Sequence, residues 1–169
     1  MAEGHRDEEA RRWFLQAQHD LRAAAWNLEG GFHDTACFLA QQAAEKGLKS
    51  THYHLGSSRR VLLTHSVVML LNKAISAAPG LSQCLEGARE LDLHYVPSRY
   101  PNGLPSGYPH QFYGKETAEK AIAASRKIME HIEDLYRTRG VPWLQDEETS
   151  EPSSSSPKGK SPKGGDKEP

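Results

Sequence analysis

Cysteine is scarce in this sequence, and neither sign of charge is in clear excess. The 169 residues include two cysteines and carry a formal net charge of −1. Two isolated cysteines without a C-x-x-C pair argue against a disulfide framework or a cysteine metal cluster. A chain so close to neutrality lacks the long-range field of a protein that coats DNA or RNA, so any nucleic-acid contact is expected to be local.

Long apolar runs are also missing. No stretch approaches the roughly 20 apolar residues that are needed to cross a bilayer. The opening segment MAEGHRDEEARRW lacks the apolar core of a signal peptide. We therefore expect a cytoplasmic protein with no membrane partner.

The common motifs of metal, nucleotide and hydrolase sites do not occur. The nine histidines include no HExxH spacing, and His52 and His54, two residues apart on a predicted helix, point to different faces. The sequence has no G-x-S-x-G, no phosphate loop and no G-x-G-x-x-G. We therefore expect neither a metal ion nor a cofactor.

Most of the chain has the apolar periodicity of helices. Apolar residues recur three and four positions apart, which predicts helices over residues 7–29, 33–55, 66–78, 81–91 and 115–140. Glycine and proline at 30–31, 56, 79–80 and 140 mark the helix ends. No alternating strand pattern is present. The sequence therefore predicts an all-α, up-and-down bundle of four to five helices.

A long loop rich in proline and tyrosine precedes the last predicted helix. Between residues 91 and 113, prolines at 97, 101, 105 and 109 bias the residue before each of them to extended backbone. We therefore expect no helix or strand in this loop. Loops of this length are usually functional or disordered, and its aromatic content argues against disorder. It is the first place to look for a site.

The two ends differ in composition from the helical region. From residue 145 to 169 every residue is polar, charged, glycine or proline, a composition that cannot bury enough apolar surface to fold. We expect an N-terminal extension at 1–7, a helical domain at 8–140 and a disordered tail rich in Ser, Pro, Lys and Glu at 141–169. The function is expected to lie in the helical domain.

Arg99 is the first candidate site residue. Its guanidinium is suited to a phosphate, and Tyr95, Tyr100 or Tyr108 would offer a ring on which a base can stack. The alternative is structural: the tyrosines anchor the loop to the bundle, and Arg99 binds loop carbonyls or a core carboxylate. The sequence leaves both open.

Arg89 and His94 form a second candidate pair where the fourth predicted helix meets the loop. If the helix ends near Asp92, His94 can turn back toward Arg89. Such a pair suits RNA cleavage, with His as general acid or base, Arg stabilising phosphate charge, and a symmetric dimer supplying a second His. The alternative is that Arg89 pairs with Glu86, Glu90 or Asp92 on the helix surface.

Four segments together resemble the HEPN domain, a nucleotide-binding family of higher eukaryotes and prokaryotes. They are ARRWFLQAQHDLRAA, CFLAQQAAEKGLKS, THSVVMLL and LDLHYVPSRYPNGLP, and the resemblance covers about residues 8–139. Its most specific parts are Ala44–Lys49, His65-Ser66, and Tyr95 with the Arg99-Tyr100-Pro101 run. The resemblance implies a helical bundle that commonly dimerises.

Two functional groups are implied by this resemblance. One contains nucleotide- or nucleic-acid-binding modules, found beside a minimal nucleotidyltransferase or at the end of a large chaperone-like protein such as sacsin. The other contains metal-independent ribonucleases with an Arg followed, after four to six residues, by a His. The Arg99-Tyr100-Pro101 loop resembles the first group, and Arg89 with His94 matches the spacing of the second.

We therefore expect a module that binds a nucleotide or RNA phosphate through Arg99, Tyr95, Tyr100 and His65. It would act as a homodimer, with a nucleotidyltransferase partner or in a larger assembly. One alternative is a toxin-like, metal-independent ribonuclease that uses Arg89 and His94 across a dimer. Another is a dimerisation or scaffold domain with no ligand.

Overall fold

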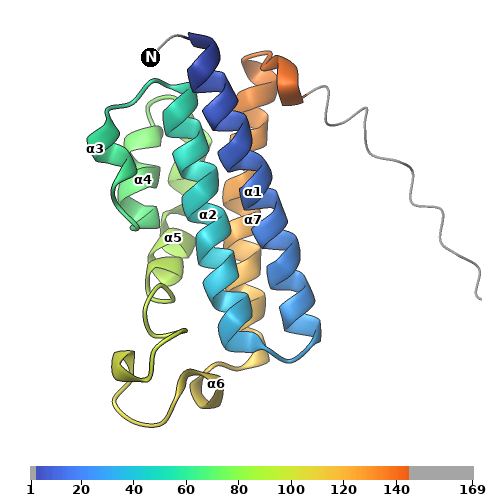
Figure 1. Cartoon of the computed structure of the whole chain (residues 1–169), viewed down its shortest axis with the longest axis vertical. Helices are drawn as coiled ribbons and strands as arrows, with labels where there is room; N and C mark the ends of the chain where they lie inside the picture. Colours follow the sequence, from blue (N-terminus) through green and yellow to red (C-terminus); the bar gives the residue numbers. More distant parts are fainter. Residues whose placement is uncertain (1–2, 145–169) are drawn as a thin grey trace, which may run out of the picture.

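The computed structural model of the chain describes residues 3–144 and shows a helical bundle. Three long helices, α1 (Glu3–Glu29), α2 (His33–His54) and α7 (Lys115–Thr138), run side by side along the molecule (Figure 1). The shorter α4 (Val67–Ala74) and α5 (Leu85–Asp92) pack against α2. Within residues 3–144 there is no strand, so the predicted all-α, up-and-down bundle is confirmed. None of these helices is long and apolar enough to span a membrane.

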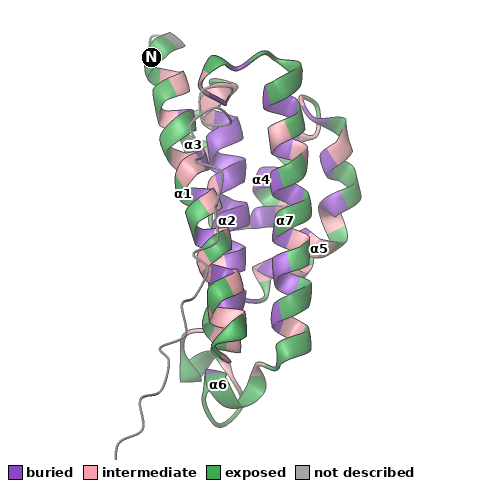
Figure 2. Ribbon diagram, turned by 90° about the vertical axis from the view of Figure 1, so that its right-hand side faces the viewer, coloured by how far each residue is buried: buried purple, intermediate pink, exposed green. Residues whose placement is uncertain are grey.

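Helix α2 forms the centre of the bundle. It contacts α1, α4, α5 and α7, and its buried positions are rich in alanine, which lets the neighbouring backbones come close (Figure 2). At Gly47 a side chain would collide with the sulfur of Met129 on α7. A Cβ at this position would therefore require the flexible Met129 side chain to move.

The core continues past the last long helix. Gly140 adopts a φ of 64° and ends α7, after which the chain turns back onto the bundle. The Trp143 ring then packs 5.7 Å from the ring centre of Phe14 and 5.1 Å from that of Tyr136. Val141 and Leu144 are buried.

The helical domain therefore extends beyond both expected boundaries. Val141, Trp143 and Leu144 pack into the core and do not belong to the tail, because a short apolar cluster follows the glycine that ends α7. Residues 3–7, expected to precede the domain, form the first turns of α1. The rest of the predicted disordered tail, 145–169, lies outside the described residues.

Several single turns of helix were not predicted from the sequence. Helix α3 (Arg59–Leu62) lies in a polar connection. The predicted helix over residues 81–91 begins as the 3₁₀ helix η1 (Pro79–Cys84) and continues as α5. The prediction of a loop without helix is wrong at η2 (Pro101–Gly103) and α6 (Pro109–Phe112). Each of these two turns has proline at its start, where the missing N–H is not needed. As predicted, the residues before Pro101, Pro105 and Pro109 are extended, with ψ of 128°, 152° and 160°.

Asp92 joins the end of α5 to the start of α4. Its carboxylate accepts hydrogen bonds from the Val67 amide (2.6 Å), the Val68 amide (3.3 Å) and the Ser66 hydroxyl (2.7 Å). The Ser66 hydroxyl in turn accepts from the Met69 amide at 3.1 Å. These bonds satisfy amides that an isolated helix end would leave unpaired. They also fix the point from which the long loop departs.

Candidate functional site

Arg99 lies against three aromatic rings. Its Cζ is 4.4 Å from the ring centre of Phe38 on α2, 4.7 Å from Tyr95 and 4.9 Å from Tyr100. These distances are those of favourable cation–π contacts. Its Nε donates a 2.8 Å hydrogen bond to the Tyr95 carbonyl. Over residues 3–144 no carboxylate pairs with Arg99.

His65 completes the cluster. Its ring stacks on Tyr95, with the ring centres 4.8 Å apart and an angle of 15° between the planes. The His65 side chain is 55% exposed, and its Nδ1 lies 3.1 Å from the carboxylate of Glu45. The structure therefore brings together all four predicted binding residues, His65, Tyr95, Arg99 and Tyr100. Within residues 3–144, Tyr108 is not among the rings that form a cation–π contact with Arg99.

A buried polar network lies beneath this cluster. The Glu45 carboxylate is 5% exposed and accepts hydrogen bonds from Lys49 Nζ (2.8 Å), Gln41 Nε2 (3.1 Å) and Gln42 Nε2 (3.3 Å). Gln41 Nε2 also donates to the His65 carbonyl at 3.1 Å. A buried carboxylate is tolerated only when it is paired and hydrogen bonded, as Glu45 is here. Since Glu45 is held by these bonds, its contact with His65 Nδ1 holds the His65 ring in place.

The structural interpretation of Arg99 holds in part, and the binding interpretation stays a prediction. Arg99 does bind a loop carbonyl, and the stacking of Tyr95 on His65 does anchor the loop to the start of α4. The core carboxylate, however, binds Lys49 and His65, and it is not the partner of Arg99. Among residues 3–144, the half-buried Arg99 therefore has no carboxylate partner.

Sequence reasoning missed Phe38 and the roles of Glu45 and Lys49. A signal for the last two exists, since they lie four residues apart on an alanine-rich helix. Two such charges on a core face indicate a buried pair. No sequence signal distinguishes Phe38 from an ordinary core residue.

The structure does not bring Arg89 and His94 into contact. Helix α5 ends at Asp92, as expected, but His94 is 6% exposed and its Nδ1 lies 3.3 Å from the Tyr113 hydroxyl. Its Nε2 is buried without a hydrogen-bond partner, and burial lowers the pKa of His94. Arg89 is exposed on α5. No hydrogen bond joins the two side chains in the described chain.

Burial of histidine predicts that the domain loses stability in mild acid. His94 and the buried His52 both have a pKa below the ordinary value of 6.5. The unfolded chain therefore binds more protons than the folded one just below that value. Their contribution is fully present above the unfolded pKa and is lost as the pH falls toward the lowered folded pKa.

The variant His94→Leu is expected to lose less stability than the native chain between about pH 7.5 and about pH 5. Urea denaturation at both pH values measures the difference. His19→Leu, at an exposed position on α1, is the matched control and should keep the native pH dependence. If His94→Leu and the native chain lost equal stability, His94 would not be the source of this pH dependence.

The described residues contain no group of three or more His, Cys, Asp or Glu side chains placed to hold a metal ion. Cys37 and Cys84 are buried free thiols. Burial and the nearby Asp34 raise the pKa of Cys37 to about 12, so this thiol stays protonated and unreactive at neutral pH.

Comparison with known proteins identifies the family. The model of the HEPN domain matches residues 10–135. No curated protein gives a match. Among solved structures, TT1696 from Thermus thermophilus is 36% identical with a TM-score of 0.70, covering 75% of this chain and 98% of that one.

Two further structures are similar at 32% identity. The archaeal HEPN homologue ST0689 has a TM-score of 0.61, with 75% of this chain and 96% of that one covered. The HEPN domain protein TM0613 from Thermotoga maritima has a TM-score of 0.59, with 75% and 98% covered. These likenesses, in sequence and in fold, confirm the resemblance seen in the sequence. The chain belongs to the HEPN domain family.

Proposed function

We propose that this HEPN domain binds the phosphate of a nucleotide or of RNA at Arg99. The observation that carries the proposal is the state of the guanidinium: three aromatic rings hold it in place, yet it has no carboxylate partner in the described chain. A guanidinium fixed in this way binds phosphate oxygens through paired hydrogen bonds without first losing side-chain freedom.

The neighbouring groups suit the other parts of a nucleotide. When His65 is neutral and its Nδ1–H donates to Glu45, its Nε2 is an acceptor, which matches a ribose hydroxyl. The Tyr100 ring is 50% exposed and offers a face for a base. Because Glu45 and Lys49 compensate one another, Arg99 supplies the positive charge of the site.

Membership of the family also supports a proposal about assembly. We propose that the domain acts as a homodimer and presents its bound nucleotide or RNA to a nucleotidyltransferase partner or a larger assembly. The shallow, exposed position of His65 and Tyr100 supports this, since a ligand held there stays accessible to a second protein.

Arg99→Ala is expected to weaken nucleotide binding by at least tenfold, because a charge-assisted hydrogen bond contributes about 1.5–3 kcal/mol. Arg99→Lys should be intermediate, since lysine keeps the charge but not the paired donors. Isothermal titration calorimetry with the four ribonucleoside monophosphates and a short single-stranded RNA measures the change. Arg89→Ala, which removes an exposed arginine from α5, is the control and should bind like the native chain.

Two results would overturn the proposal. Calorimetry that is silent for every compound at about millimolar concentration would favour a scaffold domain without ligand. Incubation with single-stranded RNA in EDTA should leave the RNA intact. Cleavage that His94→Ala abolishes would instead establish the ribonuclease with Arg89 and His94.

A further inference from the structure

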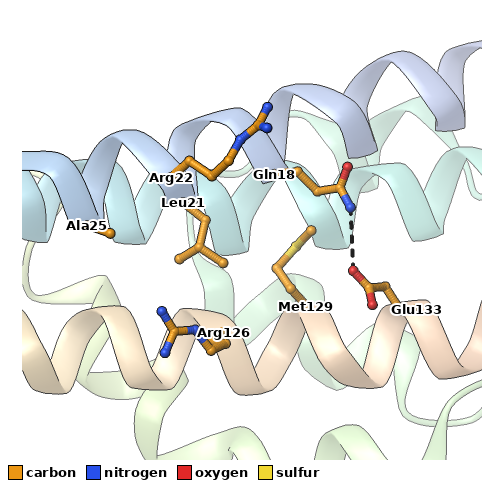
Figure 3. Close-up of a pocket in the computed structure, with 7 residues that line it drawn as sticks. All are labelled: Gln18, Leu21, Arg22, Ala25, Arg126, Met129 and Glu133. Atoms are coloured by element: carbon orange, nitrogen blue, oxygen red, sulfur yellow. Dashed lines mark hydrogen bonds between the residues drawn. The ribbon is translucent and has the colours of Figure 1, made fainter. Parts of the chain in front are cut away.

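A groove with an apolar floor and two arginines on its edges runs between α1 and α7. It has a volume of about 310 Å³, and its floor is formed by Leu21, Ala25 and Met129. Arg22 extends from α1 and Arg126 from α7, on opposite edges of the groove (Figure 3). The groove lies apart from the Arg99 cluster, which is built from α2 and the long loop.

Neither arginine forms an ion pair in the described chain, whereas most charged residues of α7 do. Lys115, Lys120 and Arg137 on α7 each form an ion pair with an acidic residue three or four positions away. In the part of the chain that the structure describes, no ion pair involves Arg22 or Arg126. The groove therefore presents two uncompensated positive charges beside an apolar strip.

The described chain ends close to one end of this groove. The Trp143 ring packs against Phe14 of α1 and Tyr136 of α7, and Leu144 after it is buried. One turn further along the two helices, Gln18 Nε2 lies 3.5 Å from Glu133 Oε1 across the groove (Figure 3). The described chain thus ends beside the same two helices that form the groove.

The segment that follows Leu144 is strongly acidic. The seven residues after Leu144 are QDEETSE, with Asp146, Glu147, Glu148 and Glu151 and no cation before Lys158. Ten helical residues separate Tyr136 from Arg126, a rise of about 15 Å, which roughly five extended residues span. The carboxylates are therefore within reach of both arginines.

We propose that the acidic segment Asp146–Glu151 binds in the α1–α7 groove of its own chain, with its carboxylates paired to Arg22 and Arg126. Single surface ion pairs contribute little, but the tether supplies a high local concentration of the segment. Because the pairs are exposed, binding weakens as salt screens the charges. The proposal is independent of the nucleotide site.

Nuclear magnetic resonance of the full 169-residue chain tests the proposal. At about 0.01 M ionic strength the amide signals of Asp146–Glu151 should differ from random-coil positions. They should move to random-coil positions in the variant Arg22→Glu/Arg126→Glu and, for the native chain, at about 1 M salt. The control Arg59→Glu/Arg60→Glu, an exposed pair on α3, should leave them in place.

A second variant changes the acidic segment and leaves the groove intact, so it tests the same contact if Arg22→Glu/Arg126→Glu does not fold. Changing Asp146, Glu147, Glu148 and Glu151 to their amides should shift the methyl signals of Leu21 and Met129. Random-coil signals for the acidic segment in the native chain would overturn the proposal. So would methyl signals in the groove that change with protein concentration but not with the amide variant, since a second copy of the chain would then be the occupant.

Discussion

The variant Glu45→Leu is expected to lower the free energy of unfolding by about 3–5 kcal/mol. Glu45 and Lys49 are both buried, with 5% and 6% of their side chains exposed, and they lie 2.8 Å apart. Removing the carboxylate leaves the Lys49 ammonium in the interior without compensation. It also removes an acceptor from Gln41 and from His65. Urea denaturation of the native and variant chains measures the loss.

The double variant Glu45→Leu/Lys49→Met separates loss of the pair from loss of packing. Replacing both charges by apolar groups of similar size is often neutral for stability, so most of the loss should be recovered. Glu45→Gln should be intermediate, because it keeps one acceptor oxygen but not the charge. A single variant Glu45→Leu as stable as the native chain would show that Lys49 reaches solvent when its partner is absent.

The variant Asp92→Ala is expected to destabilise the domain by about 2–3 kcal/mol. Its carboxylate accepts the Val67 and Val68 amides and the Ser66 hydroxyl, so alanine leaves the start of α4 without these acceptors. Since Asp92 also holds the base of the loop, Arg99 should bind nucleotide more weakly in this variant. Thermal denaturation and calorimetry measure the two effects.

Two further variants show whether the loss of stability in Asp92→Ala comes from its hydrogen bonds to α4. Asp134→Ala replaces an exposed aspartate on α7 and should change stability by less than about 0.5 kcal/mol. Asp92→Asn retains a side-chain oxygen that can accept one helix amide and should cost less than alanine. If Asp92→Ala and Asp134→Ala had equal effects, the bond between α5 and α4 would contribute nothing to the fold.

The long helices could be predicted from the sequence because each repeats its apolar pattern over several turns. Helices α1, α2 and α7 have this repeat, and their predicted positions agree with the structure. Helices α3 and α6 have four residues each, too few to show a period. The core residues after Gly140 were assigned to the tail because a three-residue apolar cluster carries no periodicity either.

Part of the Arg99 cluster could be predicted from the sequence. Arg99, Tyr95 and Tyr100 are neighbours along the chain, so a loop of this composition predicts their proximity. The contact of Arg99 with Phe38, and the bond from His65 to Glu45, join segments far apart in sequence. Local patterns do not encode such contacts. Spacing alone also could not show that the turn after Asp92 directs His94 to Tyr113.

The Arg99 cluster is complete before the loop reaches its outer half. The loop residues of the cluster all lie at or before Tyr100 in the sequence. Tyr108 and Phe112, each 50% exposed, follow in the outer half of the loop, residues 104–112. If Arg99 binds phosphate as we propose, the contact that all ligands share would stay at Arg99. The contacts that distinguish one ligand from another would then come from residues 104–112, in the part of the loop that follows the cluster.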